Sequence, residues 1–461
     1  MVVSTVVSAN GWFQSDNTGL LTDLYEITMA ACYYEQRMSH PATFSLFVRN
    51  LPPNRSFLLS AGLEEALDYL ENLRFGPEAI DYLRGTGRFQ ADFLDHLADL
   101  RFSGNVTAML EGSIVFPNEP LLEVTAPIME AQLAETYLMN AIQLGTLIAS
   151  KAARIRFAAA DKTLMDFASR RAQGRDAALK VARSSYIGGC NSTSNVLAGK
   201  EFGIPIEGTL AHSFVQSFEE EIEAFRAFAR VFPSNTVLLI DTYDTIEGAR
   251  RAVTVGQEMA RRRAKLRGVR LDSGDMIRLS KEVRRILDEG GLSEAKIYAS
   301  GSLNEYRIEE ALAAGAPIDG FGVGSHLGVS YDAPVLDIVY KLVEYDHRPV
   351  LKLSQDKQTL AGAKQIFRRY ADSGEMVEDV IALRDEKLDG MEPLLTPVME
   401  SGRRTTRRPT LDEIREDAAK NLGRLPASLR ALRELSPYPV RQSERVRDLQ
   451  SKLVESHGVS H

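Results

Sequence analysis

Three short segments rich in Gly, Ser and Asp carry the side chains best suited to hold phosphate. They are residues 270–275 (RLDSGD), 300–302 (SGS) and 322–326 (GVGSH). Small residues let backbone N–H groups approach an anion closely, and a carboxylate such as Asp272 can hold Mg²⁺ or stabilise a developing positive charge. The same residue types also cap helices and form turns, so capping is the alternative interpretation.

His212 ends the segment GTLAH, which we predict to finish a strand. An imidazole at that place can attack a phosphoryl group or act as an acid or base. The alternative is a polar strand terminus without chemistry. Its place among successive strand-end loops favours the chemical role, whereas Cys190 is predicted to be a small packing residue.

The hexapeptide DFASRR places an aromatic ring and two guanidinium groups after another predicted strand. An aromatic acid can stack on Phe167 while Arg170 pairs with its carboxylate. The alternative places Phe167 in the core and the arginines in surface ion pairs.

The elements that must position these residues are repeated βα units between about residues 160 and 330. Short apolar, β-prone runs alternate there with longer helix-like stretches, which is typical of parallel sheets. The predicted strand runs are TLMDFASRR, YIGGCNSTSN, IEGTLAHSF, TVLLIDTYDT, GVRLDSGDM, KIYASGSLNE and DGFGVGSHL. A closed barrel and an open doubly wound sheet both put ligands at the carboxyl ends of strands. We favour the barrel because polar strand-end residues recur in nearly every unit. The expected division is 1–145, a mixed α/β N-terminal domain; 146–345, the barrel; and 346–461, a region completing the N-terminal domain plus a helical tail.

Composition excludes several classes of function. The chain has 461 residues, and its 55 Lys and Arg against 63 Asp and Glu give a net charge of -8, without the broad basic field that nucleic acid binding uses. The arginines of segment 403–408 are interpreted as a solvated loop. Two cysteines and the lack of a basic leader or long apolar run predict a cytoplasmic protein outside the membrane.

Seven motifs occur in an order that resembles the nicotinate phosphoribosyltransferases. They are LTDLYEITM, DFASRR, GTLAH, VRLDSGD, ASGSLNE, GFGVGSHLGVSYDAP and VYKLVEYDHRPVLKLS, and the resemblance covers about residues 18 to 370. The resemblance implies an irregular α/β barrel beside a mixed α/β domain, in a homodimer with shared active sites. It also implies transfer of phosphoribose from phosphoribosyl pyrophosphate to nicotinate, coupled to ATP hydrolysis and assisted by Mg²⁺.

The resemblance also assigns residues. His212 corresponds to the histidine phosphorylated by ATP, and Asp272 to a catalytic carboxylate. Tyr25 corresponds to an aromatic that reaches the partner's site and sandwiches the pyridine ring against Phe167. The ribose and phosphates would be bound by Arg270, Asp272, Ser273, Gly301, Ser302, Gly324 and Ser325. A wider phosphate shell would comprise Arg49, Lys341, Arg348 and Lys352.

Ser194 bears on the choice of substrate. The related nicotinamide enzymes carry an Asp in a Gly-Thr-Asp-Thr segment, where this chain has Ser192-Thr193-Ser194-Asn195. Without that carboxylate the site loses an acceptor for an amide and a repulsion against an acid, which favours nicotinate. The alternatives are a nicotinamide phosphoribosyltransferase, another phosphate-binding barrel enzyme, or a non-catalytic homologue.

Overall fold

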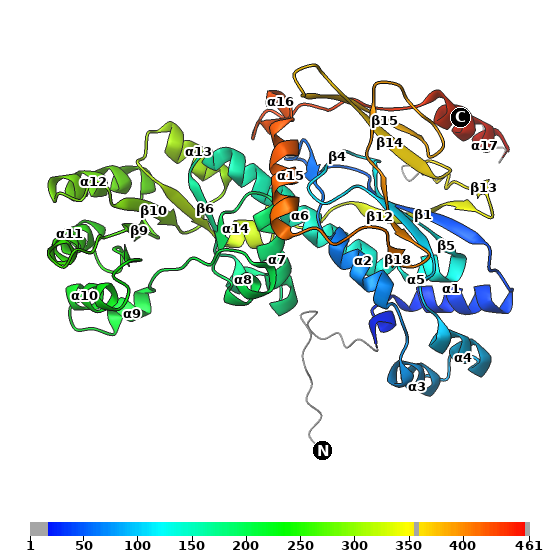
Figure 1. The fold of residues 1–461 in the computed structure, drawn as a ribbon, viewed down its shortest axis with the longest axis horizontal. Coiled ribbons are helices and arrows are strands. Elements are labelled where there is room, and N and C mark those ends of the chain that lie inside the picture. Colours follow the sequence, from blue (N-terminus) through cyan, green and yellow to red (C-terminus); the bar gives the residue numbers. More distant parts are fainter. Residues whose placement is uncertain (1–16, 355–358, 457–461) are drawn as a thin grey trace. The chain divides into compact units, whose positions relative to one another are not determined.

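A computed structural model describes residues 17–354 and 359–456. The chain forms two compact units. Unit 1 comprises Met1–Ser150 and Ala333–His461, and unit 2 comprises Lys151–Asp332. Unit 1 is thus assembled from both ends of the chain, with unit 2 inserted between them (Figure 1).

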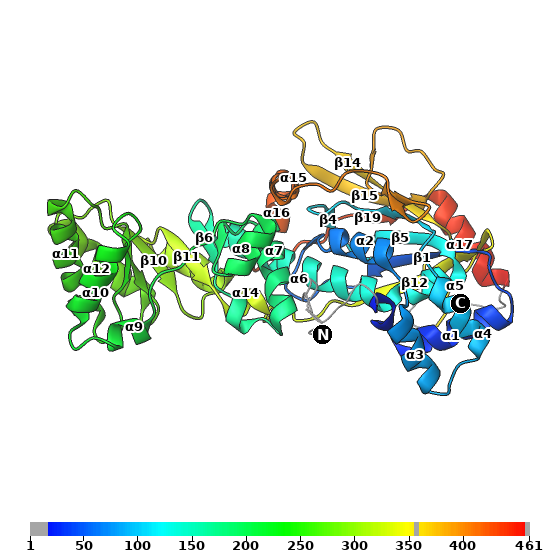
Figure 2. The same cartoon turned by 60° about the horizontal axis from the view of Figure 1, so that its bottom comes forward.

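Unit 2 is built on a parallel six-stranded sheet, so the carboxyl ends of its strands share one edge. In spatial order the strands are β7 (Ser192–Thr193), β6 (Thr163–Asp166), β11 (Gly320–Val323), β10 (Lys296–Ser300), β9 (Gly268–Leu271) and β8 (Val237–Leu239). The helices that follow them are α7 (Arg175–Ile187), α8 (Val196–Phe202), α9 (His212–Gln216), α10 (Glu221–Val231), α11 (Thr245–Arg261), α12 (Met276–Glu289), α13 (Glu305–Ala313) and α14 (Ser325–Gly328). Figures 1 and 2 both show α11 and α12 side by side, flanking this sheet.

Four helices of unit 2 begin in the same way after a strand-end loop. The side chains of Asn195, Asp244, Asp275 and Asn304 accept hydrogen bonds from the first turns of α8, α11, α12 and α13. This satisfies backbone N–H groups that the helix itself leaves unpaired. The capping interpretation of segment 270–275 is therefore correct for Asp275. Asp272 lies three residues earlier and is not the capping residue of α12.

Two of the predicted strands of unit 2 are largely wrong. The run containing GTLAH forms only an isolated bridge between Thr193 and Ile206, and residues 207–211 are extended loop. The run YIGGCNSTSN begins as the end of α7, because Gly189 adopts a left-handed φ of 110° and turns the chain before β7. Strand β7 is only two residues long, so the chain beside it at Ile206 can form no more than a short pairing with it.

Unit 1 contains an antiparallel seven-stranded sheet. Its spatial order is β13 (Arg348–Pro349), β12 (Ile338–Tyr345), β1 (Pro41–Val48), β5 (Pro120–Pro127), β3 (Asn105–Ala108), β17 (Thr396–Glu400) and β18 (Arg403–Arg404). A second sheet has the order β16 (Glu392–Pro393), β14 (Lys364–Tyr370), β15 (Met376–Leu383) and β19 (Val440–Gln442), and β2 (Leu58–Leu59) pairs with β4 (Ile114–Val115). Strand β1 is buried at every residue after Pro41, so it is a central strand covered on both faces.

The helices from the N-terminal part of the chain contribute buried residues to a hydrophobic core of unit 1. They are α1 (Leu24–Glu35), α2 (Leu63–Asn72), α3 (Pro77–Gly85), α4 (Ala91–Asp99), α5 (Ile128–Leu133) and α6 (Glu135–Ala159), the last of which continues along the chain into unit 2, and Leu20 of η1 (Thr18–Leu20) packs against the same core. The C-terminal part of unit 1 adds α15 (Leu411–Gly423), α16 (Ala427–Arg430) and α17 (Glu444–Ser456). In the described part of the chain, no helix combines the length and apolar character needed to cross a membrane.

Candidate active site

His212 is the first residue of α9, at the carboxyl edge of the parallel sheet. Its Nδ1 lies 3.1 Å from the hydroxyl of Thr242, and its Nε2 lies 3.9 Å from a carboxylate oxygen of both Asp241 and Asp272. The imidazole side chain is 38% exposed. One ring nitrogen is thus held by a hydroxyl while the other faces two carboxylates, an arrangement suited to an oriented nucleophile or base.

Asp241 follows β8 and was missed by sequence reasoning. Its side chain is 1% exposed, and Oδ2 accepts hydrogen bonds from the N–H of Asp272 at 2.9 Å and the hydroxyl of Ser273 at 2.6 Å. Its Oδ1 is buried without a hydrogen-bond partner among the described residues. A recognisable signal existed, because LLID and VRLD are both apolar strands that end in Asp.

Asp272 joins two of the predicted phosphate loops. Its Oδ1 accepts a hydrogen bond from the hydroxyl of Ser300 at 2.5 Å. Gly301 has a φ of 92°, and a Cβ at that position would lie 1.9 Å from the carbonyl oxygen of Asp272. Glycine is therefore required for both its backbone conformation and this close approach. Ser302, next in the chain, also has a positive φ, at 49°.

A cavity of about 500 Å³ opens between these two loops. Asp272, Ser273, Gly301 and Ser302 line it, together with Arg307 from α13. This volume is within the usual range for a small-molecule site. The structure therefore brings together the 270–275 and 300–302 segments around one space.

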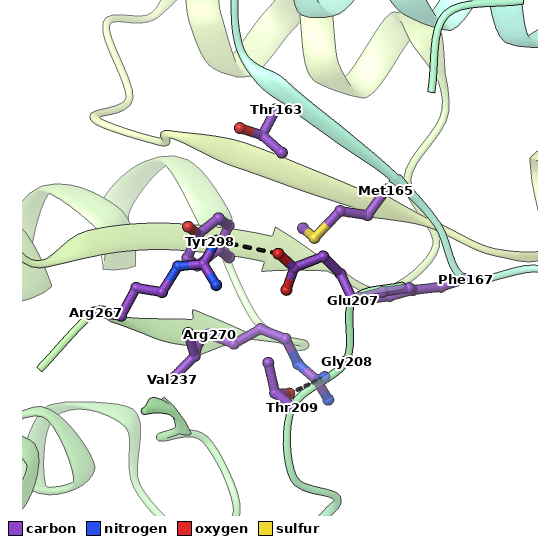
Figure 3. A pocket seen from close by; sticks show the side chains of 10 residues that line it. All are labelled: Thr163, Met165, Phe167, Glu207, Gly208, Thr209, Val237, Arg267, Arg270 and Tyr298. Carbon is purple, nitrogen blue, oxygen red and sulfur yellow. Dashed lines mark hydrogen bonds and ion pairs between the residues drawn. The ribbon is translucent and has the colours of Figure 1, made fainter. Parts of the chain in front are cut away.

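A second, smaller pocket lies between the sheet and the loop of residues 207–209 (Figure 3). Its walls include Phe167, Thr209 and Arg270, and Arg267 faces Glu207 across it at 3.1 Å. The Arg270 guanidinium donates to the Thr209 hydroxyl and lies 5.9 Å from the centre of the Phe167 ring.

Burial lowers the pKa of the Arg270 guanidinium, and the charges of Asp272 and Asp241 oppose that effect. Arg270 Nε is buried without a hydrogen-bond partner among the described residues. An arginine stays protonated at such a place, so it is a fixed cation beside an aromatic face. This combination suits a planar aromatic acid.

The third glycine-rich segment packs against Phe167. A Cβ at Gly322 would lie 2.4 Å from the Phe167 ring, so glycine makes room for the ring on β11. Gly324 and Ser325 follow at the start of α14. Arg170 is exposed in the short helix η2 (Ser169–Arg171).

Ser194 follows β7 and is half-buried. Its N–H donates to the carbonyl of Asp166 at 2.8 Å, which ties it to the strand that precedes Phe167. Cys190 is buried, as expected for a packing residue.

Five predicted site residues belong to unit 1. Tyr25 lies in the first turn of α1, and burial together with the charge of Glu135 raises the pKa of its hydroxyl. Lys341 Nζ lies 3.7 Å from Glu135 Oε1, so Tyr25 and Lys341 share one acidic neighbour. Arg49 pairs with Asp337 at 3.6 Å, just before β12.

The remaining members of that shell lie at the other end of β12. Arg348 begins β13 and is exposed, as is Lys352. The length of β12, roughly 25 Å for eight extended residues, separates Arg49 from Arg348 within unit 1. Unit 1 alone therefore does not gather these cations.

Arginines of the basic segment 403–408 form ion pairs within unit 1. Arg404 donates to Glu64 at 2.7 Å and to Asp68 at 2.8 Å on α2, and Arg407 pairs with Glu413. These ion pairs attach the segment to unit 1.

The fold and the site together define an α/β protein with Gly-, Ser- and Asp-rich loops at the ends of parallel strands, beside a histidine held between a hydroxyl and two carboxylates. Comparison with known proteins makes the class specific. Sequence models match three parts of the chain: the nicotinate phosphoribosyltransferase N-terminal domain at residues 20–143, the family itself at residues 162–373, and the C-terminal domain at residues 388–450.

Full-length relatives agree with these matches. The nicotinate phosphoribosyltransferase pncB2 of Mycobacterium tuberculosis is 48% identical over 93% of this chain and 92% of its own length. The Bacillus subtilis nicotinate phosphoribosyltransferase is 42% identical over 83% and 79%. The human nicotinic acid phosphoribosyltransferase structure matches with a TM-score of 0.86 and 30% identity over 94% of this chain and 99% of that one. The chain belongs to the nicotinate phosphoribosyltransferase family.

Proposed function

We propose that this protein transfers the phosphoribosyl group of phosphoribosyl pyrophosphate to nicotinate, in a step coupled to ATP hydrolysis. The products are nicotinate mononucleotide and pyrophosphate, and the reaction returns the pyridine to NAD. The supporting observation is the convergence of His212, Asp241 and Asp272, in a chain of this family, beside a cavity lined by the two sugar-phosphate loops.

The transfer step breaks the bond between ribose C1′ and the pyrophosphate oxygen and forms a bond from C1′ to the pyridine nitrogen. Positive charge develops at C1′ as pyrophosphate leaves. The Asp272 carboxylate lines the cavity and is held by Ser300, so it can stabilise that charge without reorganising. The loops contribute by holding the two reactants in line.

The residues present fit a magnesium ion. Asp241 Oδ1 is a buried carboxylate oxygen without a partner among the described residues, and Asp272 lies beside it. No group of three or more acidic, His or Cys side chains in the described ranges forms a metal cage. Magnesium commonly uses one or two carboxylates plus substrate phosphates, and when bound it neutralises the charge of the departing pyrophosphate.

His212 is the proposed acceptor of the ATP γ-phosphoryl group. If Nδ1–H donates to Thr242, the lone pair of Nε2 is free to attack phosphorus while the bond to the ADP oxygen breaks. The phosphoryl group would then lie beside Asp241, which holds the 272–273 backbone and hydroxyl. Repulsion between these negative charges would shift that loop, and so couple ATP hydrolysis to binding of the sugar diphosphate.

The pyridine acid is assigned to Phe167 and the arginines around it. Burial lowers the pKa of the Arg270 guanidinium, and the nearby charge of Arg170 lowers it further. A carboxylate between two such cations would relieve their repulsion, so nicotinate is favoured over its uncharged amide. Ser194 adds no negative charge that would repel the acid.

The irregular barrel, the dimer and the location are also part of the proposal. Residues from β6, β8, β9, β10 and the 207–209 loop line one pocket, which supports a sheet curved around an interior. Tyr25 is 47% exposed, consistent with a residue that completes a partner's site in a homodimer. No disulfide bond joins Cys32 and Cys190, which fits the cytoplasm.

The decisive test measures pyrophosphate release with nicotinate or nicotinamide, each with and without ATP. We expect release with nicotinate, stimulation by ATP, and little release with nicotinamide. Activity on sugar phosphates without pyrophosphate release would contradict the proposal and favour another phosphate-binding enzyme. Release with nicotinamide alone would assign the sister activity.

The histidine assignment is tested separately. Mass spectrometry at neutral pH after incubation with ATP should find an acid-labile phosphate on the wild type and none on His212→Asn. An unmodified wild-type histidine, in an enzyme whose activity ATP stimulates, would contradict this role.

A further inference from the structure

A buried cluster of four charged side chains lies in unit 2 outside the site described above. Lys151 Nζ donates to Glu305 Oε2 at 2.6 Å and to Asp332 Oδ1 at 2.7 Å. Arg154 Nε donates to Glu305 Oε1 at 3.2 Å. We call these residues the Lys151 cluster.

The cluster is almost completely removed from water. The exposed side-chain fractions are 1% for Lys151, 3% for Arg154 and 0% for Glu305, and only Asp332 is partly open at 20%. Its two cations balance its two carboxylates. Burying such groups costs more than it gains compared with apolar packing, so stability alone is a poor explanation for it.

The acidic members are attached to both of the glycine-rich loops that follow β10 and β11. Glu305 is the first residue of α13, three positions after Ser302. Asp332 lies seven positions after Ser325, beyond α14. Lys151 bonds to both carboxylates, so a single ammonium group links the ends of the two loops.

A further observation places Lys151 next to the second loop. Burial lowers the pKa of the His326 imidazole, and the charge of Lys151 is the next largest cause. His326 directly follows Ser325, and its ring packs against Tyr331, the neighbour of Asp332. The cluster and this loop therefore form one packed assembly.

We propose that Lys151 and Glu305 are positioning residues that set the distance between the 301–302 loop and the 324–325 loop. The inference rests on the proposed assignment of those loops to the sugar phosphates. Hydrogen bonds of fixed length from one ammonium group hold both loops at the spacing that a sugar diphosphate needs. Neither residue touches the substrate.

The test uses Lys151→Met, Glu305→Gln and the double variant in the full-length enzyme. We expect kcat/KM for phosphoribosyl pyrophosphate to fall by about 10- to 100-fold in each single variant, mainly through a higher KM for this substrate, because small displacements of positioning groups are costly. The KM for nicotinate should change little. The double variant should lose less than the product of the two single losses, because the two residues act as one unit.

The matched control is Arg368→Met in unit 1. Arg368 and Asp379 form a comparably buried ion pair, with exposed side-chain fractions of 2% and 0%, and neither is a proposed site residue. This variant should be less stable to urea but should keep the wild-type KM for phosphoribosyl pyrophosphate. If Lys151→Met does not fold, Asp332→Asn takes its place, because Asp332 is partly exposed and its loss leaves the Lys151–Glu305 pair intact.

Folded cluster variants with an unchanged KM for phosphoribosyl pyrophosphate would overturn the inference. An equal rise in the KM values for both substrates would also overturn it, as would an equal rise in the KM for phosphoribosyl pyrophosphate in Arg368→Met. Either result would show that the substitutions destabilise the protein generally rather than displace the two loops. The proposed function fails differently: wild-type enzyme would release no pyrophosphate from nicotinate and the sugar diphosphate.

Discussion

The imidazole of His212 is controlled by groups from two different strand ends. Thr242 holds one ring nitrogen, while Asp241 and Asp272 face the other. Asp241 is the member that connects them, since its second oxygen binds the backbone that carries Asp272. Asp241 therefore contacts both the histidine and the loop that carries Asp272 and Ser273.

We expect Asp241→Asn to slow phosphorylation of His212 by ATP by about 100-fold, at the low end for a positioned acid–base group. The amide keeps the acceptor for the Asp272 N–H but removes the charge. The rate of formation of acid-labile phosphate measures the effect. Asp244→Asn is the control, because it changes a helix cap three residues away to another good capping residue. Equal rates in both variants would refute a special role for Asp241.

A substitution at Gly301 tests how closely the 270–275 and 300–302 loops, which we propose bind the sugar phosphates, must approach each other. Gly301→Ala should lose the activity and several kcal/mol of unfolding free energy, because the new Cβ overlaps the Asp272 carbonyl. The control is Gly315→Ala, because Gly315 also has a positive φ, 68°, but a Cβ added there would meet no other atom. It should cost only about 1–2 kcal/mol of strain and keep the activity. Urea unfolding and kcat/KM separate the two effects.

For single residues of the candidate site, the sequence could predict the residue types but not all of their hydrogen-bond partners. His212, Asp272 and Gly301 were identified because each belongs to a recognisable motif. Asp241 was not, since its importance comes from hydrogen bonds to residues about 30 positions away in the chain. Such contacts depend on neighbouring strands, which a local pattern does not specify.

The elements of unit 2 were predictable where an apolar run ends in Gly, Ser or Asp. Strands β6, β8, β9, β10 and β11 lie within the predicted runs. The prediction was wrong for residues 207–211 because the run there lacks a neighbour long enough to pair with. Strands β14 and β15 were overlooked, although KQIFRRY and MVEDVIAL contain apolar residues suited to strands. The barrel, the domain boundaries and the dimer remain predictions.

The start of α1 has a pH-dependent contact. Glu26 accepts hydrogen bonds from the N–H and the hydroxyl of Thr136, at 3.2 and 2.5 Å, next to the proposed ring-stacking Tyr25. Burial raises the pKa of Glu26 to about 7 from its ordinary value of 4.5. The folded protein therefore binds more protons than the unfolded chain between these values, and stability falls as the pH rises through this range.

Glu26→Gln should remove that dependence. Compared with wild type, its unfolding free energy should be relatively higher at about pH 8 than at about pH 5, because only the wild type must ionise a buried carboxyl. Urea unfolding at both pH values measures the difference. A gap that does not change with pH would show that Glu26 keeps an ordinary pKa.

At the scale of the whole molecule, shared active sites predict complementation between inactive subunits. Tyr25→Ala and His212→Ala should each lack ATP-stimulated activity when expressed alone. If the two are co-expressed, mixed dimers contain one intact site, so random assembly should restore about a quarter of the ATP-stimulated wild-type activity. Sites contained within one chain would show no restoration. Light scattering on the same samples verifies that dimers have formed.

The division of unit 1 between the two ends of the chain has a consequence during synthesis. Strand β1 pairs with β12 about 300 residues later, and β3 pairs with β17. A ribosome takes roughly 15 to 60 seconds to make that interval, and unit 2 is finished before the interval ends. The buried strand β1 therefore emerges long before its later partner. We expect the nascent chain to carry a finished parallel sheet together with an apolar strand β1 that is paired with β5 on one side only. The open edge of β1 is then the segment that chaperones must shield.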